Sequence, residues 1–248
     1  VQDFANSSPA ELVAYLELTY GKDWRSKPLL LKNLWDVQEL SLQSSNRRLS
    51  KNGLLQEPLE IPYFTDARIV GALTPNAKAP VRDIVANITH HQAPHKIGSQ
   101  LVVQAYPELI REVVPTDIVT HLFGNYFEPK HVSSGPFGLP FLPALTTVPL
   151  FVASSSSSSK DEKTQQQSHR PFTALHCEPI GNVAVQLQGE KQWTLVSLEF
   201  SFLLRPTASP DGRAYIAAIK PLPEEELHHL PRYHAPTQAG DAIWVPTC

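Results

Sequence analysis

The stretch FTALHCEPIGNVAVQLQGEKQW, residues 172–193, decides what fold we expect. A histidine and an acid one residue apart, His176 and Glu178, stand near its start, and Lys191 stands near its end. Between them NVAVQLQG alternates apolar and polar residues, as a half-buried β-strand does. Residues i and i+2 of a strand share one face. We therefore expect His176 and Glu178 to face the interior of a barrel and Cys177 to face outward.

The second half of the chain reads as a series of short strands separated by turn residues. This pattern favours a β-sandwich or barrel. A polar serine-rich tract at 154–168 has nothing to bury and is expected to be a flexible insert. The expected strands are 144–153, 173–179, 183–189, 191–197, 214–220 and 241–246.

The first half carries most of the helical signals. Ser8, Pro9 and Glu11 form a capping box with a proline in the first turn, and Gly21 is a typical stop, so a helix is expected between them. Further helices are expected at 79–89 and 106–124, the latter broken at Pro115, and strands at 28–35 and 63–73. We expect a helix-rich part, 1–141, packing on a β core, 142–248.

Composition excludes some functions. The net charge of −3 with no long basic block disfavours a mainly electrostatic nucleic-acid binder. No apolar run reaches the ~20 residues of a membrane span, and no signal peptide is visible. Two cysteines make no disulfide framework, so an intracellular setting, cytoplasmic or nuclear, is expected.

The ends of the sequence suggest a piece of a longer protein. The chain begins with Val1, contains no methionine, and ends on the strand-like AGDAIWVPTC. Natural termini are usually exposed and poorly ordered. We therefore expect the last strands of the β core to lie beyond Cys248.

The residue types in the opening stretch suit a metal and an acidic co-substrate. An imidazole and a carboxylate, completed by a second histidine, form a facial triad for Fe(II). A short His-x-Glu match also arises by chance, and a hydrogen-bonded strand histidine is the ordinary alternative. Lys191 strengthens the metal interpretation, because a buried lysine is costly unless a carboxylate neutralises it. The distal carboxylate of 2-oxoglutarate would do so, with Thr173 as a second donor.

TALHCEP, Asn182 and VQLQGEKQW together resemble the core of the JmjC-type, cupin-like 2-oxoglutarate oxygenases. AGDAIWVP is similar to the strand that leads to the second iron-binding histidine in that family. The resemblance implies a double-stranded β-helix (jelly-roll or cupin) core with helical N-terminal elements, α+β but dominated by β. It also implies Fe(II) on His176 and Glu178, and 2-oxoglutarate on Lys191 and Thr173 with Asn182 as a further contact. No catalytic residue beyond the metal ligands is expected.

Two features depart from the family. The hydroxylase branch mostly has Asp where this chain has Glu178, and the second histidine would fall beyond Cys248. Of the three histidines that could substitute, His228, His229 and His234, the last is the best placed, and His90, His91 and His95 could suggest a second metal site. Polar loops are the ordinary interpretation of the remaining candidates, His228 and His229 in one segment and His90, His91 and His95 in another.

The resemblance implies a dioxygenase that hydroxylates a protein side chain. The alternative is a non-catalytic cupin-fold scaffold that binds a protein partner. A third possibility is a cupin with another metal, but a metal site alone does not explain a lysine at position 191. We expect a protein or peptide substrate, no membrane contact and a homodimer, with nucleic acid disfavoured.

Overall fold

The computed structural model describes the chain in separate ranges. They are 7–34, 59–66, 75–90, 93–99, 101–102, 122, 149–153, 171, 173, 175–177, 181–208, 215–217 and 230–246. The helices are α1 (Pro9–Tyr20), α4 (Val81–His90) and the 3-10 turns η1 (Trp24–Ser26) and η3 (Leu198–Leu204). The strands are β1 (Leu29–Leu31), β2 (Glu60–Tyr63), β3 (Ala77–Pro80), β4 (Lys96–Ser99), β5 (Leu150–Ala153), β6 (His176–Cys177), β7 (Asn182–Val185), β8 (Glu190–Val196), β9 (Pro206–Ala208), β10 (Tyr215–Ala217), β11 (Arg232–Gln238) and β12 (Ala242–Val245).

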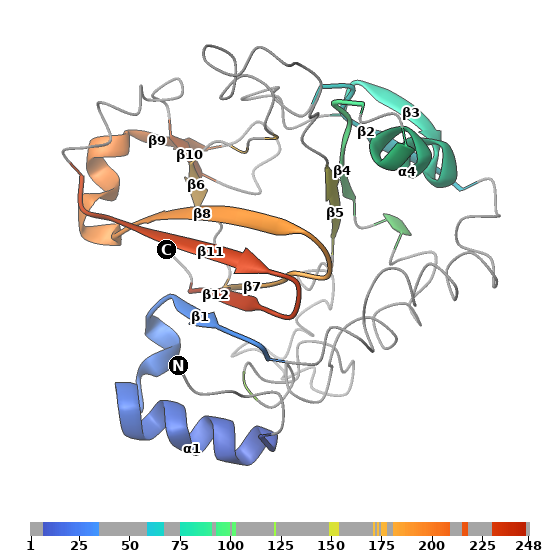
Figure 1. Ribbon diagram of the computed structural model, residues 1–248. Coiled ribbons are helices and arrows are strands. Elements are labelled where there is room, and N and C mark those ends of the chain that lie inside the picture. Colours follow the sequence, from blue (N-terminus) through green and yellow to red (C-terminus); the bar gives the residue numbers. More distant parts are fainter. Residues whose placement is uncertain are drawn as a thin grey trace, which may run out of the picture.

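The strands form small antiparallel sheets with few helices around them, as Figure 1 shows. Their orders are β1-β12-β7, β6-β10-β9, β11-β8, β2-β3 and β4-β5. The β-rich fold expected from the sequence is therefore present. Within the described ranges the sheets do not close into a barrel.

Helix α1 forms where its capping signals predict. The Ser8 hydroxyl accepts a 3.3 Å hydrogen bond from the Glu11 backbone N–H, and the Glu11 carboxylate accepts a 2.8 Å bond from the Ser8 N–H. This reciprocal pair satisfies two of the donors that a helix N-terminus leaves open. The helix ends before Gly21, whose φ of 85° suits glycine.

The first hydrophobic cluster joins the N-terminal helix to the sheet β1-β12-β7. Trp244 of β12 is 6% exposed, and its indole N–H donates to the Arg25 carbonyl at 2.8 Å. Strand β1 pairs with β12 across more than two hundred residues of sequence. The buried members are Leu12, Leu16, Trp24, Leu29, Leu31, Leu34, Leu122, Ala242 and Trp244.

The second cluster lies under α4 and gives β4 its orientation. Ile97 and Ser99 of β4 are buried, whereas Lys96 and Gly98 are only partly buried. Because alternate residues of a strand face opposite sides, Lys96 projects away from the core. The buried members are Ile61, Val81, Ile84, Ile88, Ile97 and Val102.

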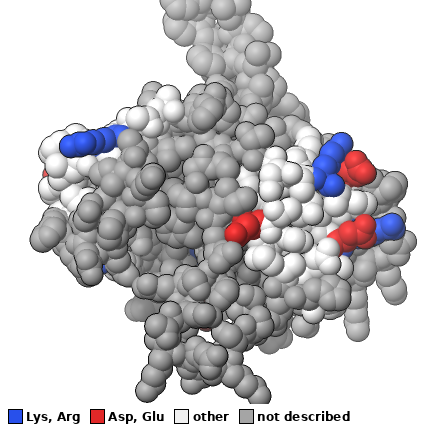
Figure 2. All heavy atoms as spheres, turned by 90° about the horizontal axis from the view of Figure 1, so that it is seen from above, with Lys and Arg blue, Asp and Glu red and all other residues white. Residues whose placement is uncertain are grey.

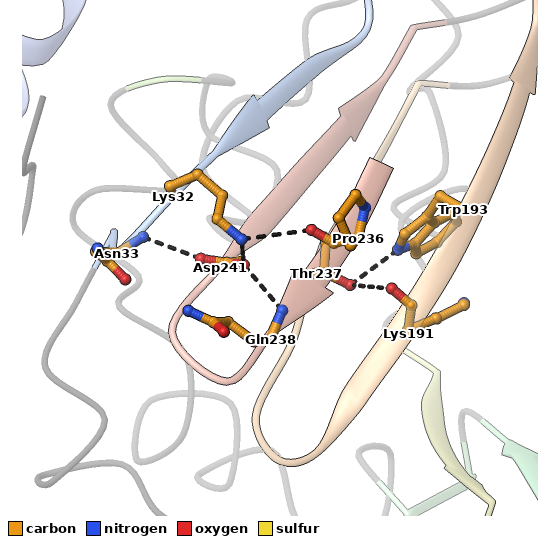
Figure 3. Close-up of polar contacts among 8 residues, drawn as sticks. All are labelled: Lys32, Asn33, Lys191, Trp193, Pro236, Thr237, Gln238 and Asp241. Atoms are coloured by element: carbon orange, nitrogen blue, oxygen red, sulfur yellow. Dashed lines mark hydrogen bonds and ion pairs between the residues drawn. The ribbon is translucent and has the colours of Figure 1, made fainter. Parts of the chain in front are cut away.

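The turn between β11 and β12 is organised by a fully buried carboxylate, Asp241 (Figure 3). Asp241 forms an ion pair with Lys32 and accepts backbone N–H groups from Asn33 at 3.0 Å and Gln238 at 2.8 Å. Gly240, at φ 93°, donates to the Gln186 carbonyl at 3.0 Å. These contacts connect the turn to the segments that follow β1 and β7.

The structure corrects two expectations from the sequence. The segment before Gly240 was interpreted as a polar loop, but its residues 232–238 form β11 and pair along all of β8. The segment around His95 was also interpreted as a loop, but β4 begins at Lys96. In both strands polar residues occupy partly exposed positions, so the apolar signal for a strand is weak.

Other expectations are confirmed or lie outside the described residues. The structure has helix α4 and strands β1, β5, β6, β7, β8, β10 and β12 at the expected segments, with ends shifted by a residue or more. The strand expected at 63–73 is not confirmed, because β2 covers Glu60–Tyr63 and shares only Tyr63 with it, and residues 67–73 lie outside the described ranges. The expected helices at 106–124 and the serine-rich insert at 154–168 lie outside the described ranges, apart from Leu122.

Charge on the described surface is mixed. On the face in Figure 2, basic and acidic atoms lie side by side at the right-hand part. Two exposed pairs belong to the β2-β3-α4 unit, Lys78–Glu60 at 3.5 Å and Arg82–Asp83 at 3.3 Å. No helix in the described ranges combines the length and apolarity that crossing a membrane requires.

Asp241→Asn should destabilise the protein by about 2–4 kcal/mol. In the variant the amide keeps one acceptor oxygen, but its NH2 group faces donors that bind the carboxylate in the wild type. The Lys32 ammonium also loses its counter-charge. Chemical denaturation measures the loss. Asp83→Asn, on an exposed carboxylate, is the control and should cost less than about 1 kcal/mol. Equal losses in the two variants would contradict the role given to Asp241.

Gly181→Ala should cost about 1–3 kcal/mol through overpacking. A Cβ at this position would lie 2.3 Å from Cη2 of Trp244, whose ring is held by its bond to Arg25. Gly98→Ala is the matched control, since its Cβ would meet the edge of the exposed Phe151 ring at 3.1 Å, and that ring can move. Unfolding midpoints compare the two, and a larger loss for Gly98→Ala would contradict the packing account.

Candidate functional site

Lys191 lies at the start of β8, as expected from the sequence, and its backbone is fixed by β11. It stands opposite Thr237 in the β8-β11 ladder. The buried Thr237 hydroxyl donates to the Lys191 carbonyl at 3.1 Å and accepts from Trp193 Nε1 at 3.1 Å. Figure 3 shows the Lys191 side chain leaving these bonds on the side away from Asp241. The pairing of β8 with β11 therefore fixes the Lys191 backbone and limits the positions that its ammonium can occupy.

The Lys191 ammonium is surrounded by aromatic rings and a second cation. Its Nζ lies 3.7 Å from the centroid of the Trp193 ring and 5.9 Å from that of Phe151. Although much of the residue's surface is exposed, burial of the ammonium and, to a smaller extent, the charge of Lys96 together lower the pKa of Lys191 to about 8. The free protein therefore holds this charge in an unfavourable place.

Thr173 was expected to assist Lys191, and it contacts another lysine. The Lys96 Nζ donates a 2.8 Å hydrogen bond to Thr173 Oγ1 and lies 5.9 Å from the Phe64 ring centroid. Burial also lowers the pKa of Lys96. Lys96 is not among the residues predicted from the sequence, although the alternation K-I-G-S could have indicated its position on the open face of a strand.

Phe151 connects the two lysines. It pairs with Gly98 of β4, two residues along from Lys96, and its ring packs against the space that the missing Cβ of Gly98 leaves. Figure 1 shows the start of β8 beside β5, in agreement with the approach of Lys191 to Phe151. Lys96, Thr173 and Lys191, here called the two-lysine site, therefore lie in one neighbourhood.

The expected iron ligands are only partly described. His176 is exposed on β6, where it pairs with Ile216, and Cys177 is partly buried, which reverses the expected inward His176 and outward Cys177. Glu178 lies outside the described residues. Asn182 begins β7 opposite Val245. Among the described residues no group of three His, Cys, Asp or Glu side chains could hold a metal ion.

The other histidines in the described ranges have local structural contacts. His234 is exposed on β11, with Nδ1 3.4 Å from the Thr194 hydroxyl. His95 Nδ1 lies 3.0 Å from the Thr65 carbonyl, and its ring meets Tyr63 edge-on. His90 ends α4 and is exposed. His91, His228 and His229 lie outside the described residues.

Cys177 is disulfide-bonded, next to the expected ligand His176. This differs from the reduced thiols that a cytoplasmic or nuclear setting favours. In such a compartment glutathione and thioredoxin would tend to open the bond.

Comparison with known proteins supplies no relative from which a function could be transferred: no protein-family model and no curated protein matches this chain. The resemblance to JmjC oxygenases therefore rests on the motif residues alone.

Proposed function

We propose that the protein is an Fe(II)- and 2-oxoglutarate-dependent oxygenase that hydroxylates a protein side chain. The observation that carries the proposal is the Lys191 ammonium, which is partly desolvated and lacks a carboxylate partner in the described part of the chain. A cation held in this way is costly unless an anion joins it. A carboxylate of a bound co-substrate supplies that anion.

The residues fit the distal carboxylate of 2-oxoglutarate. Lys191 provides a charged donor, and Thr173 provides a hydroxyl in the same neighbourhood. Charge-assisted hydrogen bonds of this kind are about twice as strong as neutral ones. Asn182 is proposed as a further contact to the co-substrate.

Iron would be held by His176, Glu178 and a histidine that the resemblance places beyond Cys248. His176 is exposed on β6. Iron bound there would supply the oxidising chemistry, with dioxygen and 2-oxoglutarate as co-substrates. The chain's own part is to hold the co-substrate by its far end and orient it toward the metal.

The finer fold in this proposal is a double-stranded β-helix. The antiparallel order of β1-β12-β7 and β11-β8 supports it, because a jelly roll is built from two facing antiparallel sheets. A protein substrate and a homodimer complete the proposal.

A second candidate is a protein-binding scaffold, and an exposed apolar group favours it. Leu198, Phe202 and Leu203 of η3 are 52%, 69% and 44% exposed, and Tyr233 of the adjoining strand β11 is 64% exposed. Exposed apolar groups of this kind often mark contact surfaces. The two candidates differ in whether 2-oxoglutarate binds and is consumed.

Lys191→Ala should weaken 2-oxoglutarate binding about 10- to 100-fold, the loss expected for a charged hydrogen bond. Anaerobic calorimetry with Fe(II) measures the affinity, and conversion to succinate measures turnover. Lys78→Ala is the control, because that lysine is exposed and paired with Glu60. Unchanged binding in Lys191→Ala would remove the main support for this co-substrate. Absence of binding and turnover in the wild type would favour the scaffold.

Binding of 2-oxoglutarate should weaken as pH rises through about 8, the pKa of Lys191. The folded protein holds this pKa below the ordinary lysine value, so Lys191 loses its charge in this range and binding then requires proton uptake. Between pH 7 and pH 9 the affinity should fall by about 10-fold. Calorimetry in two buffers of different ionisation enthalpy detects the proton. Lys191→Met should flatten the profile, and a flat wild-type profile would contradict this role.

A further inference from the structure

Lys96 is held near Lys191 by a different pair of strands, β4 and β5. In β4 it stands opposite Ala153, on the face turned away from the second cluster. Its backbone exchanges two 2.9 Å hydrogen bonds with Phe64, which fixes the start of the strand. The ammonium then reaches Thr173, 77 residues away in sequence.

The bond from Lys96 determines what the Thr173 hydroxyl can do. Because the ammonium has no acceptor, Lys96 must be the donor and Thr173 Oγ1 the acceptor. The hydroxyl proton of Thr173 is then directed elsewhere. Thr173 is exposed, so this proton can reach a bound anion.

The two cations lack acidic partners within the described part of the chain. The ion pairs there join other residues: Lys32–Asp241, Lys78–Glu60 and Arg82–Asp83. The charge of Lys96 nevertheless acts on Lys191, so the two ammonium groups oppose each other. A bound anion relieves this repulsion and restores part of the lost solvation.

We propose that Lys96 is a second anchor for the anion, so that one carboxylate of a dicarboxylate is bound jointly by Lys191, the Thr173 hydroxyl and Lys96. Lys96 contributes its positive charge and positions the Thr173 proton. The identity of the ligand as 2-oxoglutarate rests on the proposed function. Anion binding at the two-lysine site does not require iron.

The test is the binding of glutarate to the protein without metal. Titration calorimetry measures the affinity, and the NMR signals of the lysine side chains report whether Lys96 and Lys191 contact the ligand. Lys96→Met should weaken glutarate binding about 10-fold or more. Lys96→Arg, which keeps the charge and donors, should restore part of it. Lys78→Met, on an exposed lysine, should leave the affinity unchanged. 2-Oxopentanoate, which lacks the second carboxylate, should show no dependence on Lys96 when its binding is measured with Fe(II).

Thr173→Val provides a second variant that keeps the test valid if Lys96→Met folds poorly, since Thr173 is exposed. If Lys96 acts through this hydroxyl, the losses in Lys96→Met and Thr173→Val should be less than additive in the double variant. Full additivity would overturn the positioning role.

Two outcomes separate this inference from the proposed function. Unchanged glutarate and 2-oxoglutarate affinity in Lys96→Met would overturn the inference and leave the oxygenase proposal intact. Glutarate binding that depends on Lys96, in a protein that neither binds nor consumes 2-oxoglutarate with Fe(II), would support the anion site and overturn the oxygenase proposal. Absence of glutarate binding in the wild type would overturn the inference directly.

Discussion

The buried carboxylate of Asp241 is the constraint that fixes the turn from which β11, and through it β8 and Lys191, are placed. It receives the Lys32 ammonium and the backbone N–H groups of Asn33 and Gln238, and so joins the end of β1 to the turn between β11 and β12. Once this turn is fixed, β11 leaves it in one register. That register sets β8 over seven residue pairs and places Lys191 at the edge facing β5.

The protein treats its partly buried lysines in two ways. Lys32 has a carboxylate partner and acts in the fold, because a buried pair loses stability when one member is removed. Lys96 and Lys191 have no such partner among the described residues, and burial lowers the pKa of both. A fold selected for stability alone has no reason to bring two cations together. This contrast is the physical reason for proposing that the two-lysine site binds an anionic ligand.

Sequence reasoning succeeded where the signal is local. The Ser8–Glu11 box located α1, and alternation placed Lys191 at the start of a strand. It failed for β11 and β4, whose exposed faces are polar, and it therefore missed Lys96. The contact from Lys96 to Thr173 and the pair of Lys32 with Asp241 join residues 77 and 209 positions apart. No local pattern encodes such contacts, because tertiary packing alone creates them. The iron ligands remain a prediction from the motif, with Glu178 outside the described residues.

A crystal structure of the protein with 2-oxoglutarate tests the central claim most directly. The account predicts a distal carboxylate oxygen about 2.7–2.9 Å from Lys191 Nζ, the usual length of a charge-assisted bond, with the Thr173 hydroxyl also in contact. Binding of 2-oxoglutarate elsewhere, with the Lys191 ammonium still resting on the Trp193 ring and touching no ligand, would contradict it.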